Sequence, residues 1–524
     1  MRPFIFLISL SIGISNGPIV ELPIGLTEYE MLRVHEIYSM GRETDPPPTP
    51  VRNVAEYERM QGVLIRYPFG ISTEMISEMS EDITVYCLVS SSQQSSAFNA
   101  LENGGVNLDN VEFVIGSTDS YWTRDYGPWW VVDGDRNMAV VDFTYNRPRP
   151  NDNDAPLKMS NHLEVPFYAS DIVHTGGNYM TDGLGISAST DIVYTENSIP
   201  DEDVDSLMQD YYGIETYHVV DDPNNTYIDH IDCWGKYLST TKVLIREVPE
   251  SHPQYDEIEE AAEYFSNSLN KWGEPWELFR VWTPGNQPYT NSLILNEKIF
   301  VPITGGSWDD EALTVYETAF PGYEVLGFSG SWESTDALHC RTKGIPDLQM
   351  LQIIHNPLND GSEPDINGYS LDALFDDLSG TGLIEDSMKV FWKTPGAETW
   401  DSHTLSRSSA PEEHNVWTGS IPAIVDSGLI QYFVQGADSS GRIEKSPLAG
   451  WHTFFAHPTE ACDAWLIGDL DNSGELNIID ILLLSEIVND NGFGICPQSI
   501  SDINNDDQTT VVDIVFLVNI VLNP

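Results

Sequence analysis

Short apolar runs alternate with amphipathic stretches along residues 51–354, and this alternation constrains the fold more than any other feature of the chain. The strand-like runs lie at 62–67, 138–143, 242–245 and 298–302. Residues 256–272 have the spacing of an amphipathic helix. Strands that alternate with helices predict an α/β domain. Because no clean sequence repeat accompanies the pattern, any internal symmetry has to come from the fold.

Residues 362–458 have strand and turn patterns instead. Polar and apolar residues alternate at 388–393 and again at 429–434, and 437–442 has the composition of a hairpin turn. The length and the regular turns predict an immunoglobulin-like β-sandwich. The α/β domain before it is expected to cover residues 51–358. In the strand-like run at 83–89, Cys87 is expected to be a small buried hydrophobic residue.

The N-terminus has the features of a secretory signal peptide over residues 1–17. Arg2 precedes an uncharged, mostly apolar run at 3–14, and small residues follow it. Residues 18–50 are expected to be a spacer that ends in a stiff, proline-rich linker. No later stretch reaches about eighteen consecutive apolar residues, so we expect a secreted or cell-surface protein without a transmembrane segment.

The chain is strongly acidic, with 82 Asp and Glu residues against 24 Lys and Arg and a formal net charge of −58. Nucleic acids and anionic membranes are bound by basic surfaces, so this charge argues against both as partners. A solubilising surface explains the acidity best, because the acidic residues are spread over the whole chain. A negative field that attracts a cationic substrate is the alternative.

Residues 462–524 contain a repeat that predicts a small, α-helical, calcium-binding module. Two loops with a calcium-binding pattern start at Asp469 and Asp502, and an apolar, helix-like run follows each. The oxygen ligands at positions 1, 3, 5 and 12 are Asp469, Asp471, Ser473 and Asp480 in the first loop and Asp502, Asn504, Asp506 and Asp513 in the second. Cys462 and Cys496 flank much of this segment and are expected to form a disulfide.

The two loops resemble those of type I dockerin modules, which are EF-hand-type repeats. The resemblance implies bound calcium and a cohesin-like or cell-surface scaffold as partner. The second loop departs from the pattern, because Asp507 stands where the first loop has Gly474. Positions 10 and 11 are the apolar pairs 478–479 and 511–512, where most dockerins carry Ser or Thr.

Three segments of the α/β domain concentrate polar and charged residues among aromatic ones. They lie at 121–130, 227–236 and 336–341. Together they supply a cysteine, a histidine and two carboxylates among tryptophan and tyrosine. Carboxylates bind a guanidinium through paired hydrogen bonds, aromatic faces hold its aliphatic stem, and a thiolate attacks its electrophilic carbon. The pattern therefore predicts a thiol nucleophile that acts on a guanidinium.

Two other kinds of site use the same residues. His230, Asp232, Cys233 and His339 could hold zinc, but their spacing matches no common zinc pattern. A papain-like thiol protease has its cysteine before its histidine, whereas the candidate Cys340 follows His230. A guanidine substrate accounts for the acids, the aromatic residues and the late cysteine together.

Residues 51 to about 354 resemble the bacterial peptidylarginine deiminases of the Porphyromonas type, in the guanidine-modifying superfamily that also contains agmatine deiminase. The motifs that carry the resemblance are YERMQGVLI at 57–65, WTRD at 122–125, NRPRPND at 146–152, HTGGN at 174–178, HIDCWGK at 230–236, YTNS at 289–292 and HCR at 339–341. They follow one another in the family's order. The β-sandwich also matches the family's domain order, whereas the dockerin-like tail does not.

This resemblance implies a five-bladed α/β propeller, the pentein fold, and a two-step hydrolysis that needs no metal or other cofactor. By the same likeness, Cys340 attacks the guanidinium carbon and Asn291 places this nucleophile. Asp125 and Asp232 hold the guanidinium nitrogens. His230 protonates the departing ammonia and then activates the water that hydrolyses the thiouronium intermediate.

The resemblance also indicates the substrate. Trp122 and Tyr227 are expected to flank its aliphatic stem. Arg147 and Arg149 match arginines that clamp the free carboxylate of a C-terminal arginine, and surface salt bridges are the alternative for this pair. The turn at 176–178 is expected to line the pocket. Because agmatine has no carboxylate, the arginine pair predicts deimination of C-terminal peptidylarginine to citrulline.

Two further functions stay open. An agmatine deiminase would use the same chemistry to form N-carbamoylputrescine and ammonia, on the route to putrescine. A surface scaffold with an inactive propeller would bind its partners through the sandwich and the calcium repeats. The intact set of catalytic candidates favours an enzyme over a scaffold.

Overall fold

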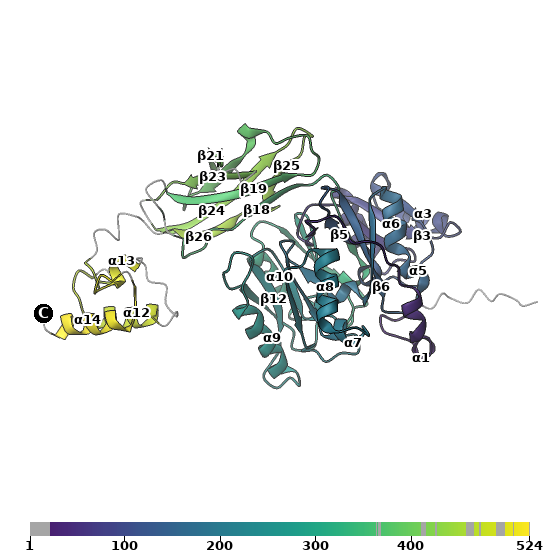
Figure 1. Cartoon of the computed structure of the whole chain (residues 1–524), viewed down its shortest axis with the longest axis horizontal. Helices are drawn as coiled ribbons and strands as arrows, with labels where there is room; N and C mark the ends of the chain where they lie inside the picture. Colours follow the sequence, from purple (N-terminus) through teal and green to yellow (C-terminus); the bar gives the residue numbers. More distant parts are fainter. Residues whose placement is uncertain are drawn as a thin grey trace, which may run out of the picture.

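The computed structural model describes residues 21–362, 364, 368–409, 415–424, 427–456, 466–470, 473–488, 498–506 and 508–522. Five small sheets fill residues 52–346, a range that is described throughout (Figure 1). In the C-terminal part, the described strands form two further sheets. Over the described ranges, the longest helices are too short or too polar to cross a membrane.

The five small sheets repeat one arrangement. In each, a short strand pairs antiparallel with a central strand, which pairs parallel with a third strand after a helical crossover. The five sets are β5 (Trp129–Val132), β6 (Met138–Tyr145) and β7 (Phe167–His174); β8 (Met180–Thr181), β9 (Ile186–Thr190) and β10 (Thr216–Val220); β11 (Gly235–Tyr237), β12 (Lys242–Glu247) and β13 (Glu277–Trp282); β14 (Leu293–Leu295), β15 (Lys298–Ile303) and β16 (Glu324–Ser329); and β17 (Lys343–Pro346), β2 (Met60–Arg66) and β3 (Thr84–Val89). Two outer strands extend them, β1 (Arg52–Asn53) beside β5 and β4 (Val111–Ile115) beside β3.

The last sheet joins the two ends of the domain, because β17 pairs with β2. The internal repeat that the sequence does not show is therefore present in the fold. The five sheets agree in number with the expected blades, and the propeller itself stays a prediction.

Helices connect the strands of each unit. The crossovers are α2 (Thr73–Asp82), α5 (Pro150–Asn153) with α6 (Ala155–Leu163), α7 (Ile192–Thr195) with α8 (Asp201–Tyr212), α9 (Tyr255–Asn267) and α10 (Asp309–Ala319), while α3 (Gln94–Asn103) and the 3-10 helix η2 (Leu108–Asn110) lead to β4. Helix α9 ends before residue 272, where the sequence predicted its end. The backbone of Ser268 is extended and Leu269 pairs with Pro275, so the chain leaves the helix there.

The predicted strand-like runs of the α/β domain are confirmed as β2, β6, β12 and β15. All eight residues of β6 are buried, as expected for a strand covered on both faces. Cys87 lies in β3 and its side chain is fully buried, which confirms its expected place in the core.

The C-terminal sheets share a separate apolar core. One contains β18 (Leu351–His355), β19 (Tyr369–Asp377), β23 (Val416–Ile421) and β22 (Ser406–Arg407), and the other β21 (Asp401–Thr404), β20 (Lys389–Lys393), β24 (Gly428–Ala437), β25 (Ile443–Ser446) and β26 (His452–Ala456). The 3-10 helix η6 (Glu385–Ser387) precedes β20. The predicted strands at 388–393 and 429–434 and the hairpin at 437–442 are confirmed. Strand β18 pairs with β19 although it precedes residue 358, and the immunoglobulin-like topology stays a prediction.

The region expected to be a spacer packs on the α/β domain. It contains α1 (Glu28–Met31) and the 3-10 helix η1 (Val34–Ser39), and η1 contacts β6 and β7. The side chains of Ile24 and Ile37 are buried, and Arg42 donates to the Asp142 carboxylate at 3.0 Å. Figure 1 shows α1 in purple beside α5. The described part of the expected spacer is therefore bound to the α/β domain.

The two predicted calcium loops have parallel hydrogen-bond patterns. Asp480 accepts from the backbone N–H group of Asn477, and Asp513 from that of Thr510, both at 2.8 Å and from the equivalent loop position. Their second donors differ by one position, the N–H groups of Leu470 (2.7 Å) and Asn504 (3.1 Å). Both aspartates lie in the helices that follow, α12 (Ile478–Val488) and α14 (Val511–Leu522), with the short α13 (Gln498–Ser501) between them. The predicted ligand Asp471, the departing Asp507 and the expected disulfide partners Cys462 and Cys496 lie outside the described residues.

Candidate active site

The candidate residues come from equivalent positions of the repeated units, just before the short first strand of each. These positions are α4 (Thr123–Tyr126), the 3-10 helices η3 (Gly176–Asn178), η4 (Ile231–Cys233) and η5 (His339–Arg341), and the turn at 289–292. Helix α4 contacts η3 and η5, and η3 contacts η4. The fold therefore brings together side chains that are more than two hundred residues apart along the chain, such as Asp125 and Cys340.

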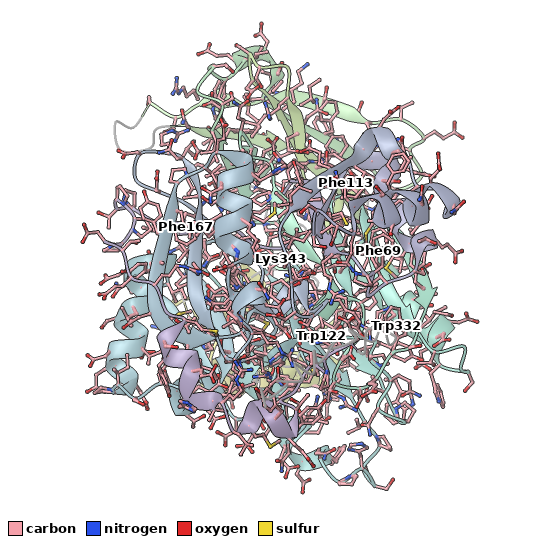
Figure 2. The ribbon with its side chains drawn as sticks, turned by 90° about the vertical axis from the view of Figure 1, so that its right-hand side faces the viewer. Phe69, Phe113, Trp122, Phe167, Trp332 and Lys343 are labelled. Carbon is pink, nitrogen blue, oxygen red and sulfur yellow. The ribbon has the colours of Figure 1, made fainter. Side chains whose placement is uncertain are left out.

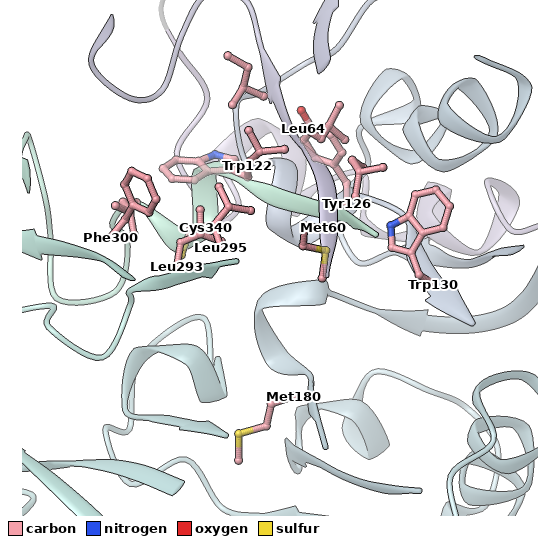
Figure 3. Close-up of a cluster of buried hydrophobic side chains, with 14 of the residues drawn as sticks. Met60, Leu64, Trp122, Tyr126, Trp130, Met180, Leu293, Leu295, Phe300 and Cys340 are labelled. Carbon is pink, nitrogen blue, oxygen red and sulfur yellow. The ribbon is translucent and has the colours of Figure 1, made fainter. Parts of the chain in front are cut away.

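Cys340 lies in the middle of this group, and its side chain is fully buried. Its Sγ accepts from Asn291 Nδ2 at 3.2 Å and lies 3.6 Å from Asp232 Oδ2. Figure 3 shows Cys340 and Trp122 in the same cluster of buried side chains. The thiol is thus fixed beside a carboxylate and an amide.

Asn291 fixes the backbone that carries Cys340. Its Oδ1 accepts from the backbone N–H groups of Ala337 and His339, both at 3.1 Å, while its Nδ2 donates to the sulfur. The side chain of Asn291 is buried. It therefore holds the turn before Cys340 and the thiol in one geometry.

Asp125 and His230 face each other beside the thiol. Asp125 Oδ1 lies 3.7 Å from His230 Nδ1, and both side chains are buried. Within the described part of the chain, neither oxygen of Asp125 and neither ring nitrogen of His230 has a hydrogen-bond partner. A Cβ atom on Gly177 would lie 2.5 Å from His230 Nδ1 and 2.6 Å from Asp125 Oδ1. Only glycine at position 177 leaves room for this pair, which gives the HTGGN motif a steric reason.

A charged network behind Asp232 is a part of the site that the sequence did not reveal. His339 Nδ1 lies 2.7 Å from Asp232 Oδ2, and His339 Nε2 lies 2.6 Å from Glu56 Oε2. Glu56 also pairs with Arg124 (2.7 Å) and Lys236 (2.9 Å). Arg124, Lys236 and His339 lie in motifs that also contain predicted site residues. Only the fold brings Glu56 to these three residues.

Burial controls the protonation of the site. Burial, and then the carboxylates of Asp232 and Asp125, raise the pKa of the Cys340 thiol well above its ordinary value. Burial and the charge of Asp232 likewise raise the pKa of Asp125, and burial lowers the pKa of His230 to about 4. Burial also acts to raise the pKa of Asp232, but the hydrogen bond from His339 holds this pKa below its ordinary value. In the free site these shifts favour a neutral thiol, a neutral His230 ring and a charged Asp232 carboxylate.

Aromatic rings border the site. The Trp122 ring is buried, and the Arg341 guanidinium lies over Trp122 and Trp332, at 5.4 and 5.0 Å from the ring centroids. Figure 2 labels these two tryptophans next to each other. Tyr227, the other predicted flank, is 67% exposed. Trp122 therefore lies in the interior and Tyr227 at the surface.

The two arginines predicted to clamp a substrate carboxylate are bound by the N-terminal segment. Arg149 Nε donates to Glu30 Oε1 at 2.7 Å, and Arg147 Nε donates to the backbone oxygen of Ile24 at 3.0 Å. Both guanidinium groups are buried. They are therefore not the surface salt bridges that were the alternative for this pair.

The zinc alternative receives no support from the arrangement of the described side chains. Among them, no three His, Cys, Asp or Glu residues are grouped in a way that could hold a metal ion. Cys87, Cys233 and Cys340 are free thiols. His339, one of the proposed zinc ligands, instead bridges Asp232 and Glu56.

Comparison with known proteins gives this geometry a context. Residues 65–346 match the family of Porphyromonas-type peptidyl-arginine deiminases. An agmatine deiminase of Medicago truncatula is 25% identical over 338 residues, which cover 53% of this chain and 88% of the relative. A putative agmatine deiminase of Mycoplasma mycoides is 26% identical over 286 residues, which cover 46% of this chain and 76% of the relative.

Solved structures show the same fold at lower identity. The agmatine deiminase of Enterococcus faecalis aligns with a TM-score of 0.51 and 18% identity, over 58% of this chain and 99% of that one. A putative arginine deiminase from Porphyromonas gingivalis aligns with a TM-score of 0.51 and 17% identity, over 56% and 98% of the two chains. The likeness supports a deiminase fold for the α/β domain.

Proposed function

We propose that this chain, which belongs to the family of Porphyromonas-type peptidyl-arginine deiminases and is a hydrolase of guanidino C–N bonds, deiminates agmatine or a similar guanidine without a carboxylate. The observation that carries this choice of substrate is the ion pair of Arg149 with Glu30. A carboxylate of the chain itself already binds the arginine that a substrate carboxylate would need. The names of the Medicago and Mycoplasma relatives support the same choice.

In the proposed reaction, the guanidinium lies between Asp125 and Asp232. Asp125 has two unpartnered oxygens for its N–H groups, as judged over the described residues. The thiol proton of Cys340 passes to His230, and the sulfur forms a bond to the guanidinium carbon. One amino group takes the proton from His230 and leaves as ammonia, so a thiouronium remains on the sulfur.

The second half of the reaction returns the enzyme to its first state. His230 takes a proton from a water molecule, and the water oxygen attacks the thiouronium carbon. The C–S bond breaks, the ureido product leaves, and the sulfur recovers the proton from His230. The second proton of the water passes to solvent, where it protonates the released ammonia. The sum is agmatine and water to N-carbamoylputrescine and ammonia, and these steps use only side chains and water, without a cofactor.

The reactivity of the thiol is expected to depend on the charge of its ligand. A cation between the two carboxylates lowers the pKa of Cys340, which burial and these carboxylates otherwise raise. The cationic reagent 2-chloroacetamidine should therefore inactivate the enzyme about 10²-fold faster than neutral 2-chloroacetamide, corresponding to about two pKa units. The inactivation rates of the two reagents check this prediction. They are measured at pH 7.5, just above the pH of ~7 at which ordinary thiols begin to ionise. Equal rates would show that the carboxylates do not control the thiol.

The pH dependence of turnover follows from the same groups. Because the pKa of Asp125 is raised in the free enzyme, the charged form that binds a cation appears only well above pH ~4. A bound guanidinium lowers this pKa again, so the acid limb of kcat/KM should lie at higher pH than that of kcat. Steady-state kinetics with agmatine over a range of pH measure both limbs. Coincident limbs near pH ~4 would contradict the raised pKa.

A second substrate class has its own support. Arg147 and Arg149 lie within the residues that match the deiminase family, and both are aimed at the N-terminal segment beside the site. If this segment moves away, the pair is free to bind the carboxylate of a peptide that ends in arginine. C-terminal peptidylarginine deimination to citrulline is therefore the second candidate.

One experiment separates the functions. Ammonia release is measured with agmatine, with a peptide that ends in Arg, and with the same peptide amidated at its C-terminus. We expect agmatine to give ammonia and N-carbamoylputrescine in equal amounts and to have the highest kcat/KM. A faster reaction of the free-carboxylate peptide would favour the second candidate, and no ammonia from any substrate would favour a scaffold with an inactive α/β domain.

We also propose that the protein is exported and that its C-terminal loops bind calcium. The signal-like residues 1–17 support export, and attachment to a cohesin-like or surface scaffold remains the proposed role of the C-terminal module. The oxygen-rich loops that start at Asp469 and Asp502 support calcium, which prefers such ligands. Asp480 and Asp513 accept equivalent hydrogen bonds from the backbone N–H groups of Asn477 and Thr510, which supports a common function for the two loops.

Removal of calcium is expected to affect the C-terminal module alone. Binding to the loops stabilises their folded state, so EDTA should lower the melting temperature of the module by several degrees. The predicted ligands and the site lie in different segments of the chain, so deimination should be unchanged. Calorimetry and an activity assay on the full chain measure both effects. A loss of activity with EDTA would indicate that calcium controls the site.

A further inference from the structure

Residues 21–31, which we call the N-terminal strap, cross the site and bind several of its residues. Trp122 Nε1 donates to the backbone oxygen of Leu22 at 3.0 Å, and Arg147 Nε donates to that of Ile24. The Ile24 side chain is buried in the cluster that contains Trp122 and Cys340. The strap therefore covers the predicted positions of both the substrate stem and the substrate carboxylate.

Glu30 of the strap binds Arg149 as a substrate carboxylate would. The two groups meet side by side, with Nε to Oε1 at 2.7 Å and Nη2 to Oε2 at 3.2 Å. The backbone oxygens of Pro23 and Gly25 accept from the same Nη2, at 2.8 and 3.0 Å. Paired hydrogen bonds of this kind are how arginine recognises a carboxylate.

The local structure of the strap holds Glu30 in this position. Thr27 caps α1, and Thr27 N and Oγ1 donate to Glu30 Oε2 at 2.8 and 2.9 Å. Glu30 is buried, while the neighbouring side chains of Tyr29 and Leu32 are 66% and 77% exposed. The inner side of the strap thus contacts the site and its outer side faces solvent.

The strap and the rest of the N-terminal region are attached to the domain by separate contacts. Its attachment near residue 21 is an ion pair between Glu21 and Arg66. Beyond the strap, Ile37 is buried, and Thr44 N donates to the backbone oxygen of Ala169 at 2.9 Å. Movement of residues 21–31 about this anchored part would expose the arginine pair and leave the domain intact.

We infer that Glu30 is a specificity-determining residue: it occupies the position of a substrate carboxylate on Arg149, so that the strap excludes peptides that end in arginine until it is displaced. This inference rests on the proposed deiminase function. Under this inference one enzyme accepts both substrate classes. It accepts guanidines without a carboxylate while Arg149 is paired with Glu30, and C-terminal peptidylarginine once Arg149 is free.

The test compares Glu30→Gln with Glu28→Gln as the matched control, since Glu28 is an exposed carboxylate in the same helix. The readout is the ratio of kcat/KM for an Arg-terminated peptide to that for its amide. Glu30→Gln should raise this ratio about tenfold or more, because Arg149 then lacks its charged partner. Glu28→Gln should leave the ratio unchanged. A folded Glu30→Gln enzyme with the wild-type ratio would overturn the inference.

A second variant and a binding measurement cover the other outcomes. Should Glu30→Gln not fold, Thr27→Ala loosens Glu30 instead, because it removes the hydrogen bond from Thr27 Oγ1 to Glu30 Oε2, and a rise of the ratio in the same direction is expected. Hydrogen exchange of residues 21–31 is also measured with a citrulline-terminated peptide and with its amide. Faster exchange with the free carboxylate alone supports the inference, and equal exchange overturns it. Because exchange needs no turnover, it decides the inference even if no substrate yields ammonia.

Discussion

Replacement of Cys340 by serine is expected to lower deimination of every guanidine substrate by about 10⁴-fold or more. A serine hydroxyl has a far higher pKa than a thiol, and the buried site with two nearby carboxylates disfavours an alkoxide further. The shape of the site should survive, because serine still offers an acceptor to Asn291 Nδ2. Ammonia release from agmatine, measured beside circular dichroism of the variant, checks both statements.

Cys87→Ala is the matched control for this change. Cys87 is also a fully buried thiol of the α/β domain, but it lies in the core strand β3. Its loss should lower the melting temperature slightly and leave kcat/KM within about twofold. Activity that survives in Cys340→Ser and falls in Cys87→Ala would remove Cys340 from the reaction.

Asp125→Asn has the second-largest expected effect, a loss of about 10²- to 10³-fold in kcat/KM. The amide removes the charge that pairs with the guanidinium and replaces an acceptor oxygen with a donor that repels its N–H groups. The stability of the protein should move the other way. Since burial raises the folded-state pKa of Asp125, its ionisation disfavours the folded state as pH rises through that pKa, and asparagine avoids this cost.

The control for this carboxylate is Asp182→Asn. Asp182 is buried too, but its Oδ1 accepts from the backbone N–H groups of Leu184 and Ile186, both at 2.8 Å. Burial also raises the pKa of Asp182, to about 6, so Asp182→Asn should change stability in the same direction as Asp125→Asn but leave kcat/KM unchanged. Thermal melts and kinetics on the same samples compare the two variants in stability and in activity. They are measured at pH 8, well above the pH of ~4 at which ordinary carboxyl groups ionise. A lower melting temperature with full activity in Asp125→Asn would contradict its role.

Much of the fold could be predicted from the sequence, because the signals were local. Continuous apolar runs marked buried strands such as β6 and β12, and a turn-forming composition marked the hairpin at 437–442. The five-fold repetition of strand pairing could not be read, since it lies in hydrogen-bond partners and not in residue types. The pairing of β18 with β19 could not be predicted for the same reason, because it leaves no local pattern in the sequence.

The candidate site was predictable where motifs carried it. Asp125, Asp232, Asn291 and Cys340 each lie in a quoted motif, and the fold brings them together. Glu56 was missed because it lies one residue before the motif at 57–65 and its residue type is common in this acidic chain. Glu30 was missed because a segment that reads as a spacer gave no sign of contact with Arg149. Both become visible only through contacts between distant parts of the chain.

The measurement that tests the proposed chemistry most directly is mass spectrometry of enzyme quenched in acid during turnover of agmatine. A covalent adduct with the mass of the substrate less one ammonia should appear on the peptide that contains Cys340, and on neither peptide that contains Cys87 or Cys233. It should vanish in Cys340→Ser together with ammonia release. Ammonia formed at an undiminished rate by Cys340→Ser would contradict a thiouronium on Cys340.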